Sequence, residues 1–192
     1  MTVGWLLVVS VMAGIAWSQS WRGSLTEDSV VRYDATAGRE AWQGVAPATL
    51  TQFTFDADDL SVTRFEVRVA SDAFDSGNRF RDRNARLVTF ESEAFPEIVF
   101  TSRRLIAGGE GGLAPGDVRE VTVEGALSLH GVERVIEVPL RVSRPEEDRL
   151  RVEGGFDVSL EAYGMRAPSI LIRTVDDEVR VSLDLTVRLQ PR

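Results

Sequence analysis

The only histidine of the chain, His130, is the side chain best suited to acid–base or metal chemistry near neutral pH. As a general base it would need a nucleophile, and the sequence has neither a cysteine nor a G-x-S-x-G motif that would present a serine. As a zinc ligand it would need further histidine or cysteine partners, which the sequence also lacks. We therefore expect His130 to fix a turn through a hydrogen bond to a neighbouring group. An enzyme built around it, a hydrolase or an isomerase, is a minor alternative.

Two acidic clusters are the next candidates, because carboxylate oxygens are the ligands that calcium prefers: Asp56, Asp58 and Asp59, and the run 176–178. Their spacing matches no known calcium loop. Aspartate is also a common turn residue, since its carboxylate accepts hydrogen bonds from nearby backbone N–H groups. We expect two solvated turns, and the sequence predicts no metal site and no cofactor.

Arg81 and Asp82 form a third polar pair. A guanidinium fork matches phosphate or ring oxygens, so Arg81 at the mouth of a cavity would suit a polar headgroup. The local alternative, which we favour, is that Asp82 caps a short helix at about residues 82–89 and pairs with the arginine. Arg81, Asp82 and His130 are the polar candidates for a mouth.

The composition limits the classes of function further. The chain has 192 residues, of which 43% are hydrophobic, and its formal net charge of −8 disfavours nucleic acid as a partner. All 22 basic residues are arginine, so Schiff-base chemistry through lysine is excluded. The absence of cysteine excludes disulfides, thiolate catalysis and an acylated-cysteine anchor.

The N-terminal segment has the character of an export signal. Val3 to Trp17 is apolar and uncharged, and Ala16 and Ser18 suit cleavage after Ser18. An uncleaved anchor is the alternative, because an uncharged segment of this length could just cross a bilayer core of about 30 Å as a helix. We expect residues 1–18 to be a signal peptide, residues 19–192 to be one domain, and the location to be periplasmic or secreted.

The segment Val121–Val142 predicts a β-hairpin that turns at His130-Gly131. Six further runs of alternating apolar and polar residues extend this prediction along the chain. Together we expect eight strands, at 29–35, 48–56, 61–71, 97–106, 121–129, 136–142, 150–160 and 178–190. Short connections favour an up-and-down barrel over a two-sheet sandwich. The fold class is therefore all-β: an eight-stranded antiparallel barrel with one short helix.

Two stretches carry more specific motifs. The first is GALSLHGV at Gly125–Val132. The second runs in order through Ser76-Gly77-Asn78, Arg81-Asp82, Leu87, Phe95-Pro96 and Phe100-Thr101-Ser102. In order and approximate spacing they resemble the "G-x-L-x-[IL]-H-G-V" hairpin and the "SGN…RD…L…YP…F-x-S" stretch of the YceI-like family of secreted bacterial polyisoprenoid- and lipid-binding proteins. The resemblance covers residues 29–189.

The resemblance implies an extended, lipocalin-like β-barrel whose apolar pore takes an isoprenoid or fatty-chain lipid, without catalytic activity of its own. The chain departs from the family at Leu160–Met165, where many members carry "[SN]-R-x-D-[FW]-G" and this sequence keeps only an aromatic–glycine pair. It also lacks the histidine that many members have near the second strand. The loop Tyr163–Ile172 that follows is expected to be a lid or to pack over the barrel end.

On this hypothesis the inward faces of the strands line the pore. The residues are Phe53, Phe55, Phe65, Val67, Phe100, Leu127, Leu129, Ile136, Val138, Phe156, Val158, Leu183 and Leu185. The main alternative is a barrel filled by its own side chains, which would make the protein a secreted stress-response or interaction module without a ligand. The sequence leaves open a transient membrane contact and a homodimer.

Overall fold

The computed structural model describes residues 20–166, 169–170 and 173–191. The expected signal peptide at 1–18 and part of the loop Tyr163–Ile172 lie outside the described residues. The strands that build the main sheet are β1 (Ser20–Leu25), β2 (Val30–Ala37), β3 (Glu40–Pro47), β4 (Thr49–Asp56), β5 (Arg64–Ala70), β6 (Glu97–Ala107), β7 (Val118–Leu129), β8 (Val132–Glu146), β9 (Arg149–Ser159) and β12 (Glu178–Pro191). A short two-stranded sheet, β10 (Ser169–Ile170) and β11 (Arg173–Thr174), lies outside it.

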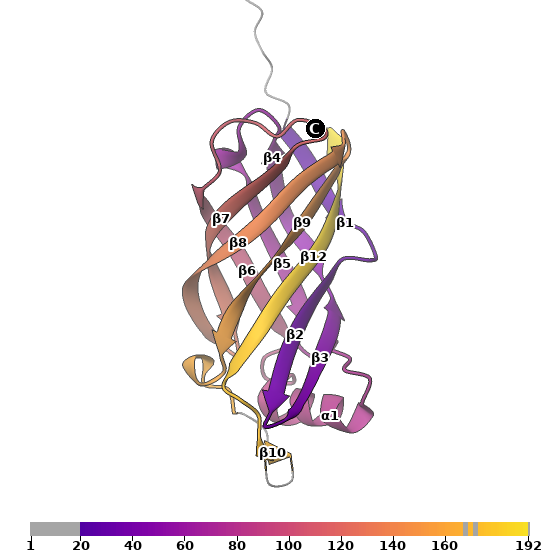
Figure 1. Cartoon of the computed structure of the whole chain (residues 1–192), viewed down its shortest axis with the longest axis vertical. Helices are drawn as coiled ribbons and strands as arrows, with labels where there is room; N and C mark the ends of the chain where they lie inside the picture. Colours follow the sequence, from indigo (N-terminus) through magenta and orange to yellow (C-terminus); the bar gives the residue numbers. More distant parts are fainter. Residues whose placement is uncertain (1–19, 167–168, 171–172, 192) are drawn as a thin grey trace, which may run out of the picture.

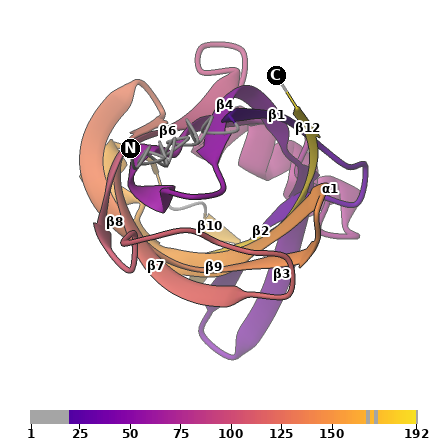
Figure 2. The same ribbon diagram turned by 90° about the horizontal axis from the view of Figure 1, so that it is seen from above.

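Eight antiparallel strands close into a barrel in the order β1-β4-β5-β6-β7-β8-β9-β12, and β12 pairs back onto β1. Viewed along the long axis, the strands form a ring (Figure 2). Strand β12 is 14 residues long and pairs with two different strands along the same edge: its first half pairs with β2 and its second half pairs with β1. The β2–β3 hairpin therefore completes the wall at one end, where a bridge joins Val45 to Asp75 beyond β5. The predicted all-β barrel is confirmed.

The β7–β8 hairpin forms where the alternation predicted it. Its strands pair from Val118 opposite Ser143 down to Leu129 opposite Val132, which leaves a two-residue turn. Both turn residues have a positive φ, 53° at His130 and 74° at Gly131, as a type I′ turn requires. The local twist of this turn matches that of the strands, so the hairpin fixes which side chains face inward on both.

Each expected run contains a strand, but β1 and β3 were missed and the expected strand at 61–71 begins only at Arg64, after a 3₁₀ turn at Leu60–Val62. The sequences SWRGSL and EAWQGVAP have few β-branched residues, so they carry little strand signal. Packing explains the glycine in β3. A Cβ at Gly44 would lie 2.2 Å from the ring of Tyr33, so only glycine lets that ring cross the strand.

The only α-helix of the described residues is α1 (Arg79–Asn84), which continues into a π-helical turn at Ala85–Thr89. The prediction that Asp82 caps it was wrong. The Asn78 side chain accepts hydrogen bonds from the backbone N–H groups of Phe80 (3.1 Å) and Arg81 (3.2 Å), so the helix begins three residues earlier. Among the described residues, no helix has the length and apolar character needed to cross a bilayer. Figure 1 places α1 at the end of the barrel remote from the C-terminus.

A buried arginine closes the opposite end of the barrel. Arg144 is only 4% exposed and packs with Trp21, Phe55 and Leu113, all of which are also buried. Its guanidinium donates hydrogen bonds to the carbonyl oxygens of Leu113 (3.0 Å) and Glu147 (2.8 Å), and it lies 5.4 Å from the centre of the Trp21 ring. These contacts satisfy the buried charge without a carboxylate, and the aromatic face adds a cation–π attraction.

We expect Arg144→Met to lower the free energy of unfolding by about 2–4 kcal/mol, because the carbonyl groups lose a charged donor and remain buried. Urea titration monitored by circular dichroism measures this change. The control is Arg141→Met on the same strand, where the arginine is exposed and a change within about 0.5 kcal/mol is expected. Equal effects of the two substitutions would show that Arg144 does not hold this end together.

Candidate functional site

An apolar cavity of about 170 Å³ occupies the half of the barrel that lies next to α1. By this measure a cavity of about 10–15 Å³ already holds one water molecule. Thirty residues line the cavity, and all except Arg32, Arg81, Asn84 and Thr89 are apolar or aromatic. Water in such a space would find few hydrogen-bond partners, so the cavity suits hydrocarbon.

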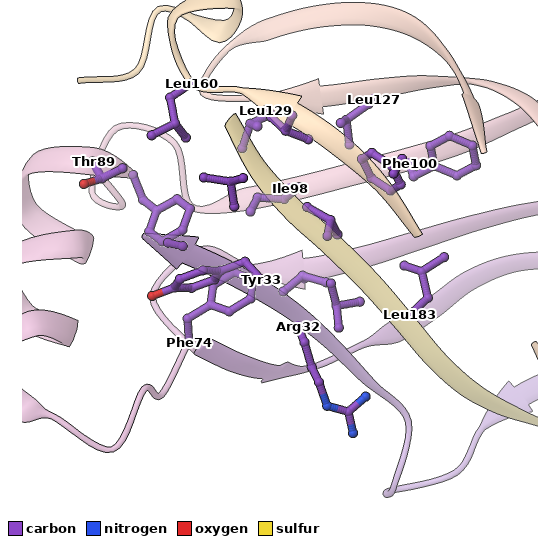
Figure 3. A pocket seen from close by; sticks show the side chains of 18 of the residues that line it. Arg32, Tyr33, Phe74, Thr89, Ile98, Phe100, Leu127, Leu129, Leu160 and Leu183 are labelled. Atoms are coloured by element: carbon purple, nitrogen blue, oxygen red, sulfur yellow. The ribbon is translucent and has the colours of Figure 1, made fainter. Parts of the chain in front are cut away.

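The lining side chains come from strands on opposite sides of the ring. Figure 3 shows Ile98 and Phe100 of β6, Leu127 and Leu129 of β7 and Leu183 of β12 gathered around the same space. Arg32 is different, because its guanidinium points away from that space and lies 4.0 Å from the carboxylate of Asp184 on the outer face. The interior surface is thus hydrocarbon over nearly its whole extent.

A second apolar cavity of about 70 Å³ lies towards the end closed by Arg144. It is lined by β1 and β4 in place of β2 and β3, and it shares five lining residues with the larger cavity: Phe65, Val67, Leu140, Val152 and Leu185. We call these five the constriction. They belong to β5, β8, β9 and β12, and they lie between the two cavities because they line both. The barrel interior therefore holds two apolar cavities with these five side chains between them, and not a solid core. We call the two cavities together with the constriction the bore.

The thirteen residues expected to line the pore fall into three groups. Phe53 and Phe55 line the smaller cavity. Ile136 packs against the buried residues of the interior but lines neither cavity. The other ten all line the larger cavity, and three of them, Phe65, Val67 and Leu185, also belong to the constriction. The ten are Phe65, Val67, Phe100, Leu127, Leu129, Val138, Phe156, Val158, Leu183 and Leu185. That these side chains contact a ligand stays a prediction.

Aromatic rings and one cation form the mouth of the larger cavity, which we define as Tyr33, Trp42, Phe74, Arg81 and Phe90. The ring of Phe74 lies 5.2 Å from that of Tyr33 and 5.4 Å from that of Phe90. The Arg81 guanidinium lies 5.0 Å from the centre of the Trp42 ring, and its Nε donates a hydrogen bond to Ser76 Oγ at 2.9 Å. Burial raises the pKa of Tyr33, so this phenol is neutral at neutral pH and Arg81 supplies the positive charge.

Asp82 and His130 do not line the cavity. The Asp82 carboxylate accepts hydrogen bonds from the backbone N–H of Ser76, at 3.0 Å, and from the Ser76 hydroxyl, and so fixes the loop before α1. His130 Nε2 lies 2.7 Å from a Glu91 carboxylate oxygen, and the ring packs on Phe95 with 4.2 Å between ring centres. His130 is therefore a turn residue held by a neighbouring side chain, as expected, and of the three polar candidates only Arg81 reaches the mouth.

The acidic clusters lie in turns and at the strand ends next to them. Oxygens of Asp56 and Asp59 accept hydrogen bonds from the backbone N–H groups of Asp58 (2.8 Å) and Ser61 (2.9 Å). Asp177 accepts one from the N–H of Glu161 at 2.7 Å, and hydrogen bonds from Ser159 and Glu161 lower the pKa of its carboxyl group. Within residues 20–166, 169–170 and 173–191, no group of three or more acidic or histidine side chains is arranged to hold a metal ion.

Several lining residues were missed by the sequence analysis. Val31, Tyr33 and Ala35 alternate with polar residues inside the expected first strand, so the pattern could have identified them. Trp42 lies on β3, for which no strand was expected. Phe74 and Phe90 lie in connections without periodicity, where only tertiary structure shows which way a ring points.

A family model described as "YceI-like domain" matches residues 25–187. The chain belongs to the YceI-like family. The resemblance carried by the motifs around Ser76 and Gly125 is thereby confirmed. No curated protein sequence matches the chain.

Solved structures share the fold of this YceI-like chain. A polyisoprenoid-binding domain from Saccharophagus degradans is 18% identical, with 88% of this chain and 98% of that one covered and a TM-score of 0.67. BcnA of Burkholderia cenocepacia is 18% identical, with 82% and 95% covered and a TM-score of 0.66. A YCEI protein of Campylobacter jejuni is 11% identical, with 100% and 91% covered and a TM-score of 0.52. At these identities the likeness is one of fold.

Xenon tests whether the bore is hollow, because it enters dry apolar cavities in protein crystals. We expect crystals of the wild-type protein under xenon to show separate density peaks on the two sides of the constriction. Phe65→Ala should add a peak between them, since it removes the largest side chain of the constriction. Phe95→Ala is the control, because Phe95 lines neither cavity and its loss should leave the xenon peaks in the bore unchanged. A bore without xenon density would refute the geometry.

Proposed function

We propose that the protein carries a single isoprenoid or other long-chain lipid inside its barrel. The observation that carries the proposal is the larger cavity, which is enclosed by strands on all sides, lined almost entirely by apolar side chains and continued by the smaller cavity beyond the constriction. A space of this form matches a flexible hydrocarbon chain better than a compact polar metabolite.

Desolvation would supply the affinity. Each methylene transferred from water to the bore gains about 0.8 kcal/mol, so a ten-carbon segment gains roughly 8 kcal/mol before the cost of ordering the chain. Few polar contacts are then needed, and selectivity for the headgroup should be loose. Arg81 is the lining group able to meet a phosphate or a ring oxygen at the mouth.

The two ends of the barrel favour one orientation of the lipid. Arg144, Trp21 and Phe55 fill the far end, whereas α1 and Arg81 form a partly polar rim at the near end. A lipid that entered tail first would keep its headgroup at Arg81, where water and the guanidinium can solvate it. The reverse orientation would bury a polar headgroup among hydrocarbon side chains, which is costly.

The family relationship supports an isoprenoid as the lipid, because the Saccharophagus degradans relative is described as a polyisoprenoid-binding domain. The periplasmic or secreted location is part of the proposal and rests on the apolar run Val3–Trp17 of the sequence. Two observations weigh against the alternatives. The cavities disfavour a barrel filled by its own side chains, and His130 is engaged with Glu91 away from the cavity.

Placing a carboxylate in the bore tests the proposal. Leu129→Asp or Val138→Asp should weaken the binding of a fluorescent polyprenyl probe at least 100-fold, because a buried unpaired charge costs several kcal/mol. Ser128→Asp is the matched control, since Ser128 lies on the opposite face of the same strand and should leave binding unchanged. Circular dichroism reports whether each variant is folded.

Leu129→Trp is a second variant that fills the cavity without adding a charge, and it should also reduce binding. Unchanged binding by the folded Asp and Trp variants would contradict the assignment of the bore as the lipid site.

A further inference from the structure

The helical segment beside the mouth has a charge opposite to that of the protein. Residues 79–89, which comprise α1 and the π-helical turn, contain four arginines and one aspartate, whereas the formal net charge of the whole chain is −8. The aspartate, Asp82, accepts hydrogen bonds from Ser76. This helical segment is therefore locally basic on an acidic protein.

The same segment exposes large apolar side chains. Phe80 is 80% exposed, Leu87 is 51% exposed and Val88 is 41% exposed. Exposing a large apolar side chain to water costs free energy, and phenylalanine is usually buried in folded proteins. Residues 79–89 thus carry three large apolar side chains that are exposed to water.

Arginines flank the apolar side chains. Arg79, Arg83 and Arg86 are exposed, and together with Phe80 and the carboxylates of Asp72 and Asp82 they line a shallow depression. No hydrogen bond or ion pair joins their guanidinium groups to any residue that the structure describes. Their charge is therefore available to an external anion.

Helical spacing gives the segment two faces. Phe80, Arg83 and Leu87 recur at intervals of three and four residues and lie on the outer face. Ala85 and Thr89 belong to the lining of the larger cavity, so the inner face is part of the mouth wall. One short segment thus contributes both to the outer surface and to the wall of the larger cavity. Figure 1 shows α1 at this end of the barrel.

We propose that the outer face of residues 79–89 docks on the surface of an anionic lipid bilayer. Phe80, Leu87 and Val88 would enter the headgroup region, and Arg79, Arg83 and Arg86 would lie at the level of the phosphates, as in interfacial amphipathic helices. The acidic remainder of the protein is repelled by the same surface, which orients the mouth towards the membrane. Docking does not depend on what the bore holds.

A protein partner is a poorer match for this face. A stable protein interface buries about 800 Å² on each side and usually has an apolar centre without charges. Here three apolar side chains are interleaved with three arginines that lack carboxylate partners among the described residues. Mixed arginine and apolar side chains suit the phosphate and acyl layers of a bilayer, which accept both at once.

Vesicle flotation tests the proposal on residues 19–192, the chain without the expected signal peptide. One set of vesicles is phosphatidylcholine alone, and the other contains phosphatidylcholine and phosphatidylglycerol. We expect the wild-type protein to float with the anionic vesicles, to remain unbound with the neutral ones, and to be released by high salt, which screens the arginines. Absence of binding to the anionic vesicles, or equal binding to both sets, would overturn the proposal.

Two variants locate the docking face. Replacing Arg79, Arg83 and Arg86 with serine should weaken binding to anionic vesicles on the order of 100-fold, because each basic side chain near such a surface contributes about fivefold. The matched control replaces three exposed arginines on other parts of the barrel with serine: Arg22, Arg141 and Arg188. It should reduce binding less than threefold, and an equal loss in both would show that only net charge matters.

Phe80→Ser with Leu87→Ser removes the apolar contribution without changing the charge and should also reduce binding at least tenfold. Val118→Ser is its control, since Val118 is 50% exposed on β7, away from the helix. All these side chains are exposed, so the melting temperatures should stay close to that of the wild type. The same variants are assayed for polyprenyl probe binding, which should persist, so failure of docking and failure of the lipid site are distinguished.

Discussion

The structure depends on how completely the inward-facing side chains fill the space inside the ring of strands. Removing those side chains from water holds the eight strands together, but a ring of eight strands is wide enough to leave space unless large residues fill it. Where Trp21, Phe55 and Arg144 point inward, the end is closed. Where valine and leucine predominate, a cavity of about 170 Å³ remains, and the proposed function follows from that remaining space.

The difference between the two ends gives the bore a direction. At the closed end the buried guanidinium of Arg144 donates hydrogen bonds to the backbone carbonyl groups of Leu113 and Glu147. The other end is built from the β2–β3 hairpin, α1 and the connection after it, and it combines aromatic rings with Arg81. A hydrocarbon tail fits the interior and a polar headgroup fits this rim. The same rim continues outward into the basic, apolar segment 79–89.

The sequence predicted most of the barrel because period-two alternation is a local property. It identified the hairpin at His130-Gly131 and ten of the residues that line the larger cavity, among them Leu127, Leu129 and Val158. It could not identify β3, since Ala and Gly give no strand signal and Gly44 is selected by the Tyr33 ring across the sheet. The misplaced cap at Asp82 has a similar cause, because Ser76 competes for that carboxylate. Rings in irregular connections, such as Phe74, are placed by tertiary contacts alone.

The account is tested most directly by native mass spectrometry of the protein purified from its own host without detergent, followed by solvent extraction of the same sample. It predicts one molecule with a long hydrocarbon chain bound per barrel, recovered and identified in the extract. A protein that is isolated at the mass of its polypeptide alone, gives an extract free of lipid and takes up no added polyprenyl lipid would contradict it.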